Sequence, residues 1–255
     1  MSLIDRWLRP TQSGVDGALN REDIEPDGTA EHDDVLEALG HELRRNYVSR
    51  EEVAVVLQSL GADQLAAHLR ENKLPTRISI RHGEFGEAIG GALFRRLKRY
   101  CVPIMKLRYK QGRNQPTHLA DILAFRLRQD PPVVAILEVK TRTSRDLAIG
   151  VEAYTQLGVT IRDGLGQAIT FVVARLADRN PTLANRIALL LAGRHSIERH
   201  VVLVYDRAAW DERVIHRLKA VVDQDTTATV VQVPGLAPLV DGAYAAAAED
   251  LARDL

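Results

Sequence analysis

The residues with the clearest chemical potential are Glu138 and Lys140, which follow the apolar run Val133–Leu137. Alternate residues of a β-strand point to the same face, so these two side chains would emerge together where a buried strand meets solvent. The same Glu-x-Lys spacing occurs at Glu71–Lys73, but there it ends a polar helix, where a solvated charge pair is the simplest interpretation. A charge that follows a buried strand needs a partner or a function, because burying an unpaired charge is costly.

A second acid, Asp121, lies in the otherwise apolar segment Leu119–Arg126. If this segment pairs antiparallel with Val133–Lys140, Asp121 comes close to Glu138 on one face of the sheet. Two neighbouring carboxylates repel each other and resist joint ionisation unless a cation lies between them. A hard divalent ion is the usual occupant of an all-oxygen site. The pair therefore predicts a Mg²⁺ site, in which Mn²⁺ would be the substitute.

Further carboxylates lie upstream of this pair. The motif Gly83-Glu84-Phe85-Gly86-Glu87 is expected to open a helix, which places both glutamates at its start. Acids there are also favoured by the helix dipole alone, so the choice between them stays open. Lys140 would orient or deprotonate a water molecule and offset negative charge in the transition state. The predicted chemistry is metal-assisted phosphodiester hydrolysis by Asp121, Glu138, Lys140, Glu87 and Glu84, with Asp121, Glu138 and Glu87 as metal ligands.

The surrounding pattern predicts the elements that must position these side chains. A helix of about four turns follows Gly83, with apolar residues on one side and bases on the other. Three strand-like runs come next, at Val102–Tyr109, Leu119–Arg126 and Val133–Lys140, and the turns between them predict a meander. Helices and strands then alternate, which favours a mixed α/β sheet. The expected elements are a helix at Leu147–Arg162, a strand at Ala168–Arg175, a helix at Thr182–His195, a strand at His200–Tyr205, a helix at Ala208–Val222, a strand at Ala228–Val233 and a terminal helix from Leu239.

The order of helix, three-strand meander with Asp and Glu-x-Lys, helix and strand resembles that of the PD-(D/E)xK nuclease superfamily over roughly Arg81–Ala177. The resemblance implies an α/β fold with a restriction-endonuclease-like core, whose catalytic acids lie on the first helix and the second and third strands. One departure is Ala120, where the superfamily pattern has Pro. The resemblance also implies that Gln156, on the next helix, reaches the metal-site carboxylates or DNA, although an exposed helical Gln is the simpler interpretation.

A narrower resemblance is to the HamA family of Hachiman anti-phage defence systems. It rests on Leu74-Pro75, on Arg81-x-Gly83-Glu84-Phe85-Gly86-Glu87 and on the Asp and Glu-Val-Lys strands, and it extends over nearly the full length. It implies a bacterial nuclease subunit that partners a DNA-translocating helicase subunit (HamB-like) and cuts DNA when released or activated. The sequence has no Gly-x₄-Gly-Lys-Ser/Thr motif, so we expect no ATP site in this chain.

Four regions are expected along the chain. Residues 1–33 are expected to form a leader and an acidic linker, because eight acids between Arg21 and Ala38 are opposed by Arg21 alone. A soluble tail is the simplest interpretation of this linker, and docking on a basic surface of the same protein is the alternative. Short helical stretches predict a helical subdomain at 34–76. The nuclease core follows at 77–178, and a C-terminal α/β extension of that core at 179–255.

Bases dominate the region from Arg95 to Arg128, where Asp121 is the only acid. Phosphate contacts need such a local excess, even though 34 bases and 34 acids give the whole chain zero formal charge. A solvated helix face and an edge strand protected by charges would look the same. The candidates for contacts with DNA are Arg95, Arg99, Lys106, Arg108, Lys110, Arg113, Arg142 and Arg145.

Composition excludes several classes of protein. A chain of 255 residues with 45% hydrophobic and 27% charged residues is typical of a folded globular protein, which argues against a disordered or fibrous one. No apolar run approaches the ~20 residues needed to cross a bilayer, and the first residues lack the apolar centre of a signal peptide. Cys101 is the only cysteine, which excludes an intramolecular disulfide and fits a reducing compartment. We therefore expect a cytoplasmic protein that does not enter a membrane.

Two other functions stay open at this point. A non-catalytic DNA-binding or scaffold subunit would keep a nuclease-like fold in order to dock on a helicase or a duplex. Such a subunit would bind DNA equally well in Mg²⁺ and in EDTA. A nuclease that acts on RNA would use the same two-carboxylate chemistry to cleave the RNA backbone.

Overall fold

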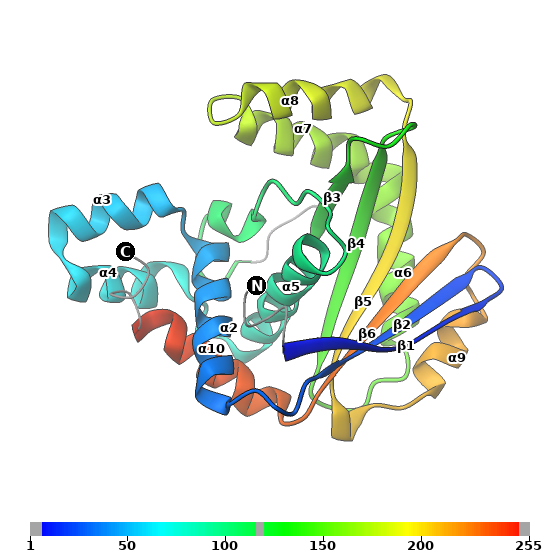
Figure 1. Cartoon of the computed structure of the whole chain (residues 1–255), viewed down its shortest axis with the longest axis horizontal. Helices are drawn as coiled ribbons and strands as arrows, with labels where there is room; N and C mark the ends of the chain where they lie inside the picture. Colours follow the sequence, from blue (N-terminus) through cyan, green and yellow to red (C-terminus); the bar gives the residue numbers. More distant parts are fainter. Residues whose placement is uncertain (1–6, 116–119, 250–255) are drawn as a thin grey trace.

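The computed structural model describes residues 7–115 and 120–249, and their strands form one six-stranded sheet (Figure 1). The strands are β1 (Leu8–Asp16), β2 (Leu19–Pro26), β3 (Ile122–Arg126), β4 (Val133–Arg142), β5 (Ser196–Asp206) and β6 (Thr226–Val233). Their order in the sheet is β1-β2-β6-β5-β4-β3. The four central strands run parallel, whereas β1 and β3 pair antiparallel at the two edges.

Helices cover both faces of this sheet. The α-helices are α2 (His32–Tyr47), α3 (Arg50–Leu60), α4 (Ala62–His68), α5 (Ile78–Arg96), α6 (Ile149–Val159), α7 (Leu165–Leu176), α8 (Pro181–Ala188), α9 (Arg213–Lys219) and α10 (Leu236–Glu249). Shorter helical turns are η1 (Leu69–Lys73), η2 (Lys106–Tyr109), η3 (Thr160–Gly164), η4 (Leu189–Ala192) and η5 (Arg207–Ala209). Helix α5 crosses one face with α2 and α10 packed beside it, and α6 and α9 lie on the other face (Figure 1). Helices α7 and α8 lie at one end of the sheet and add apolar residues to the core of that second face. None of the described helices has the length and apolar character that a membrane span requires.

Strand β4 carries the apolar run that leads to the predicted site. Ile136 and Leu137 point to opposite faces, and each is fully buried in the core on its own side. A strand buried on both faces is typical of the centre of a parallel sheet covered by helices on both sides. Glu138 follows Leu137 directly and lies on the face of Ile136, so charge appears where the run ends.

The N-terminal hairpin corrects the expectation of an acidic linker within residues 1–33. Strands β1 and β2 extend the sheet, β2 pairs parallel with β6, and Ile24 is buried. Bases far away in the sequence neutralise two acids of β2, whereas Asp23 pairs with Arg21 of the same strand. Lys98 pairs with Glu22, and Arg207 lies 2.5 Å from Glu25. The local charge count missed this strand because its neutralising charges come from other elements.

The expected three-strand meander is a two-strand pair. Residues 102–109 form no strand, and only an isolated bridge joins Cys101 to Phe125 before the chain turns into η2. Pro103 has no backbone N–H to donate to a sheet, which explains why the strand-like composition was misleading. The predicted second strand is confirmed as β3 from Ile122, and its expected start at Leu119 lies outside the described residues.

The segment Ala168–Arg175 is also not a strand, because it belongs to helix α7. Its buried residues recur every three to four positions, which is a helical period: they are Ala168, Ile169, Val172 and Leu176. The next strand after α6 is therefore β5, which the sequence analysis placed in the C-terminal extension. The fold is a mixed α/β sheet as predicted, but the order of elements expected for the nuclease core differs at these two places.

Most other expected elements are confirmed. Helices cover the greater part of 147–162, 182–195 and 208–222, strands cover 200–205 and 228–233, and the terminal helix is α10. The short helices expected in 34–76 are α2, α3, α4 and η1. Helix α2 joins the main core, since Val35, Leu39 and Leu43 are buried with residues of α5 and α10.

Candidate active site

The carboxylates of Asp121 and Glu138 come together at one end of the β3–β4 pair. Ile122 pairs with Leu137, which confirms the predicted antiparallel arrangement and places Asp121 opposite Glu138. Asp121 Oδ2 accepts a hydrogen bond of 2.8 Å from the backbone N–H of Val139. This bond anchors the Asp121 side chain to the strand that carries the other carboxylate.

Glu138 and Lys140 form the pair that strand alternation predicts. Lys140 Nζ donates a hydrogen bond of 2.7 Å to Glu138 Oε1. Burial of Glu138 and the nearby negative charge of Asp121 raise its pKa to about 6, although Lys140 acts in the opposite direction. The pair therefore combines a carboxyl group that exchanges its proton near neutral pH with a half-buried ammonium group.

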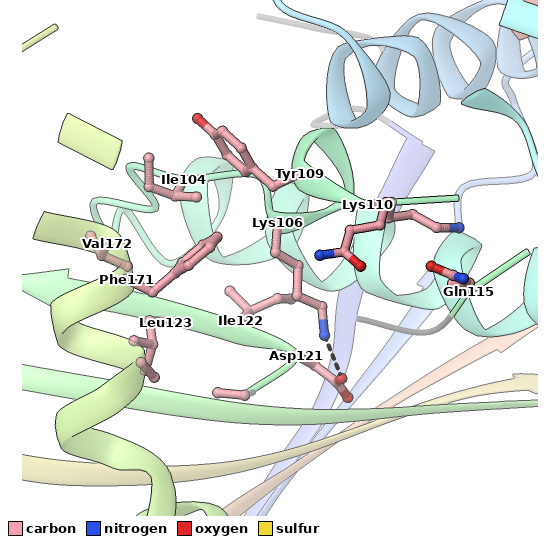
Figure 2. Close-up of a pocket in the computed structure, with 13 residues that line it drawn as sticks. Ile104, Lys106, Tyr109, Lys110, Gln115, Asp121, Ile122, Leu123, Phe171 and Val172 are labelled. Atoms are coloured by element: carbon pink, nitrogen blue, oxygen red, sulfur yellow. Dashed lines mark hydrogen bonds and ion pairs between the residues drawn. The ribbon is translucent and has the colours of Figure 1, made fainter. Parts of the chain in front are cut away.

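Lys106 lies between two of the predicted metal ligands. Its Nζ donates a hydrogen bond of 2.9 Å to Asp121 Oδ1 (Figure 2). The same atom lies 3.2 Å from Glu87 Oε2. Burial raises the pKa of Glu87 to about 8, even though the Lys106 charge opposes this effect. Burial alone would lower the pKa of Lys106, but the charges of Glu87 and Asp121 outweigh it and the pKa is raised. Lys106 thus supplies the positive charge that neighbouring carboxylates require.

Glu84 belongs to a separate buried network. The Lys110 ammonium and the Tyr47 hydroxyl both donate to its carboxylate. The Tyr47 hydroxyl also lies 2.9 Å from that of Tyr244, which comes from α10. Burial raises the pKa of Glu84, against the stabilisation of its charged form by Lys110 and Tyr47. Sequence reasoning missed both tyrosines, because residues contributed by distant helices leave no local pattern.

The two helix acids therefore have different neighbours, which the sequence could not distinguish. Glu87 shares Lys106 with Asp121, so the geometry favours Glu87 as the acid that completes the cluster. Helix α5 begins at Ile78 and not after Gly83, so both acids lie inside the helix. Their expected position in the first turn is wrong, and the helix dipole does not account for them.

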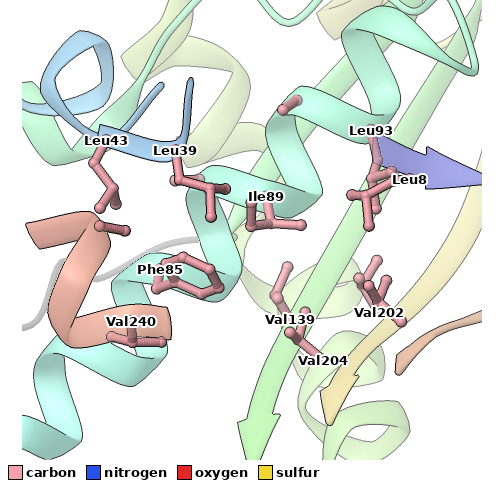
Figure 3. Close-up of a cluster of buried hydrophobic side chains, with 14 of the residues drawn as sticks. Leu8, Leu39, Leu43, Phe85, Ile89, Leu93, Val139, Val202, Val204 and Val240 are labelled. Carbon is pink, nitrogen blue, oxygen red and sulfur yellow. The ribbon is translucent and has the colours of Figure 1, made fainter. Parts of the chain in front are cut away.

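Glycines on one face of helix α5 allow the helix to pack closely against β4, which places its acids beside that strand. A Cβ atom built on Gly86 would lie 2.1 Å from Thr141 Oγ1, and one on Gly90 would lie 3.2 Å from Val139 Cγ2. Only glycine permits so close an approach of helix to strand at position 86. Apolar side chains surround this contact and fix the helix on the sheet; Figure 3 shows Phe85, Ile89, Leu93, Val139, Val202 and Val204 among them.

Most bases predicted to contact DNA have partners within the chain. Lys106 and Lys110 pair with the acids described above, and Arg95, Arg142 and Arg145 pair with Glu42, Asp146 and Asp211. Arg108 and Arg113 donate to the backbone carbonyls of Arg45 and Arg70. Of the predicted set, Arg99 and Arg145 are exposed, whereas the side chain of Arg95 is only 11% exposed. Contacts of this set with DNA stay a prediction.

Gln156 is not brought into the cluster. It is an exposed residue of α6, and within the described part of the chain no hydrogen bond joins it to the carboxylates. The arrangement matches the simpler interpretation of this residue, and its role beside the site stays a prediction.

The acids form pairs instead of a complete metal shell. Within 7–115 and 120–249, no three His, Cys, Asp or Glu side chains lie close enough together to hold a metal ion. Asp121 raises the pKa of both Glu138 and Glu87, so it is the centre of the cluster. A divalent cation fits the donor chemistry beside Asp121 and Glu138, because it would relieve their repulsion. Glu87 would join only if Lys106 moved aside.

Comparison with known proteins relates this chain to one family. A family model described as HamA matches residues 6–232. A search of curated proteins found no match. The matched region contains every residue of the cluster and the whole of α5, β3 and β4.

Proposed function

Because this chain belongs to the HamA family, we propose that it is a metal-dependent DNA nuclease and the effector subunit of a Hachiman anti-phage defence complex. Membership of the family indicates a component of Hachiman defence, and the nuclease activity is our proposal. The reaction would be phosphodiester hydrolysis, in which a water oxygen bonds to phosphorus and the bond to one bridging ester oxygen breaks.

The observation that carries this proposal is the convergence of Asp121, Glu138 and Lys140 at one end of the β3–β4 pair. A structural ion pair needs one acid and one base, whereas this cluster adds the partly buried carboxyl groups of Asp121 and Glu87. The pKa of Glu138 is raised to about 6 and that of Glu87 to about 8, chiefly by burial. Clustered carboxyl groups with such perturbed pKa values are typical of catalytic sites.

Asp121 and Glu138 are the residues that would hold Mg²⁺, with Mn²⁺ as the substitute. When bound, the ion would neutralise their charges and stabilise negative charge on the phosphate group. Glu87 is the third candidate ligand, at the cost of its contact with Lys106. Without the ion, the Lys106 ammonium balances Asp121 and keeps the carboxylates in place.

Lys140 is the residue placed to act on the attacking water. Its Nζ is held 2.7 Å from Glu138 Oε1, on the strand face where the carboxylates lie, and its side chain is 27% exposed. A fixed ammonium in this position orients a water molecule and offsets the negative charge that develops on the phosphate oxygens. The Glu138 carboxylate in turn prevents Lys140 from swinging away from the site.

Incubation of the purified chain with linear and supercoiled plasmid in Mg²⁺, Mn²⁺ or EDTA tests this proposal. Glu138→Gln and Lys140→Met should each reduce metal-dependent cleavage by ~10²-fold or more, the usual loss when a positioned catalytic group is removed. The chain offers a matched control in Glu71 and Lys73, which have the same spacing outside the cluster. Glu71→Gln and Lys73→Met should cleave as the wild type does. Cleavage at the wild-type rate by a clean preparation of Glu138→Gln would refute the site.

One observation favours a second candidate function, a non-catalytic DNA-binding or scaffold subunit. Lys106 and Lys140 already balance Asp121 and Glu138, so the described cluster is stable without a cation. A scaffold would bind DNA with the same affinity in Mg²⁺ and in EDTA and would release no cleaved product in either. The plasmid assay, combined with binding measured in both buffers, separates the two functions.

We also propose a helicase subunit of the HamB type as the partner. The sequence contains no Gly-x₄-Gly-Lys-Ser/Thr phosphate loop, so strand separation driven by ATP needs another chain. Co-expression followed by size-exclusion chromatography tests the complex. Cleavage is then compared with and without the helicase and ATP. Failure of the two subunits to co-purify, together with a cleavage rate that the helicase does not change, would contradict the partnership.

A further inference from the structure

A cavity lies beside the candidate active site, and most of the residues that line it take no part in the chemistry described above. It has a volume of about 440 Å³ and lies between the segment 104–115, the start of β3 and helix α7 (Figure 2). Pockets that bind small molecules and cofactors have volumes of about 300–1,000 Å³. Lys106 and Asp121 form part of its wall, so the cavity is continuous with the carboxylate cluster.

One end of this cavity is apolar and aromatic. Phe171 points from α7 toward Lys106, with Leu123 below it (Figure 2). The Phe171 ring meets Tyr109 edge to face, with ring centroids 5.6 Å apart, and the Arg175 guanidinium lies 5.2 Å from the centre of the Phe171 ring. Phe171 is only half-buried and lies outside the set of residues by which α7 packs on the sheet. The ring therefore lines the cavity and does not fill the core.

The other end of the cavity is polar, but its charges are balanced. Lys106 pairs with Asp121, and Lys110 pairs with Glu84. A ligand that enters here gains little from carrying a charge of its own. Exposed amide groups stand on the same wall and offer both hydrogen-bond donors and acceptors; they belong to Gln111 and Gln115.

We propose that this cavity binds one unstacked nucleobase of the DNA strand whose backbone lies at Asp121. A nucleobase is flat, aromatic and uncharged, and its edges carry donors and acceptors, which matches both ends of the cavity. Stacking on Phe171 provides affinity without a preference for sequence, because every base has an aromatic face. The inference rests on the proposed nuclease function and adds the form of its substrate.

This base site selects DNA in which the nucleotide beside the cleaved bond is unpaired. Extruding a base from an intact duplex costs free energy, and a single strand or an unwound end avoids that cost. The chain therefore binds and cuts single-stranded or unwound DNA in preference to a closed duplex.

Binding measured without cleavage tests the base site. In EDTA, fluorescence anisotropy compares the affinity of the full chain for a single-stranded oligonucleotide with its affinity for the same sequence as a blunt duplex. Phe171→Leu keeps an apolar side chain but removes the stack, so the single-strand to duplex affinity ratio should fall by about 5- to 150-fold. Phe171→Tyr keeps a ring and should restore the ratio. Tyr154→Leu removes an aromatic ring from α6, outside the cavity, and should keep the wild-type affinity ratio.

An unchanged ratio in Phe171→Leu would overturn the proposal, as would an equal loss of affinity for both forms of DNA. A 2-aminopurine base in the oligonucleotide gives an independent readout, because stacking on Phe171 quenches its fluorescence and Phe171→Leu should remove that quenching. The two proposals fail separately. A chain that shows the ratio effect but never cleaves refutes the nuclease and leaves the base site, whereas cleavage without the ratio effect refutes the base site alone.

Discussion

Replacing Glu87 by Gln should flatten the dependence of protein stability on pH. Burial raises the pKa of Glu87 from 4.5 to about 8, although Lys106 opposes the rise. The folded protein therefore holds a proton that the unfolded chain releases at intermediate pH. The stability contributed by this proton is complete below pH 4.5, and it is lost as the pH rises through 8.

The expected size follows from the two pKa values, which differ by 3.5 (8 minus 4.5). At 1.36 kcal/mol per pH unit, the full contribution is about 5 kcal/mol. Between pH 6 and pH 8 the folded carboxyl changes from almost fully to half protonated, while the unfolded one stays ionised. Deprotonation of Glu87 should therefore lower the unfolding free energy of the wild type by about 2 kcal/mol between pH 6 and pH 8. Glutamine resembles the protonated carboxyl and does not titrate. Between pH 6 and pH 8, the unfolding free energy of Glu87→Gln should therefore fall by about 2 kcal/mol less than that of the wild type.

Urea unfolding followed by circular dichroism at pH 6 and pH 8 measures this difference, with EDTA present to exclude metal binding. Glu138, whose pKa is about 6, is present in both proteins and cancels in the comparison. Glu71→Gln makes the same chemical change at an exposed position and should keep the wild-type dependence on pH. Equal losses of stability in the wild type and in Glu87→Gln would refute the reasoning that position 87 holds a buried, protonated carboxyl.

Two further predictions concern the support of the site. Gly86→Ala should destabilise the fold by about 1–3 kcal/mol in urea unfolding, because its Cβ would lie 2.1 Å from Thr141 Oγ1. Gly83→Ala lies in the same helix, with no atom within 4 Å of the added Cβ, and should not destabilise the fold in this way. Equal losses of stability in the two variants would contradict the close approach of α5 to β4 at Gly86. Lys106→Met should destabilise the metal-free protein by about 1–3 kcal/mol, since the Asp121 carboxylate loses its ammonium partner and Glu87 loses a hydrogen-bond donor. Millimolar Mg²⁺ should then raise the Tm of Lys106→Met more than that of the wild type, and an equal rise would contradict competition between the ammonium and the metal.

The core of the candidate site was predictable because it depends on neighbouring residues. Strand alternation alone places Glu138 and Lys140 on one face, and the loop between two apolar runs brings Asp121 opposite Glu138. The same reasoning could not choose between Glu84 and Glu87. That choice depends on which lysine each acid meets. Lys106 comes from the segment 102–109, which was expected to be a strand, and Lys110 follows that segment directly.

Charge compensation shows most clearly what a local pattern cannot determine. The acids of β2 indicated a solvated linker, but bases 76 and 182 positions away neutralise Glu22 and Glu25 and allow the segment to join the sheet. The predicted DNA contact Lys106 likewise lies inside the fold, where it pairs with Asp121 and contacts the carboxyl group of Glu87.

The sequence by itself determined the α/β class, the buried strand that carries the Glu-x-Lys pair, and the position of its partner acid. These follow from periodicity and burial, which the order of residues along the chain encodes directly. Only the tertiary structure decided the strand order, the position of Lys106 and the aromatic cavity beside Asp121. Ion pairs and cavities arise between elements distant in sequence, and their energies depend on separations in space that no local period specifies.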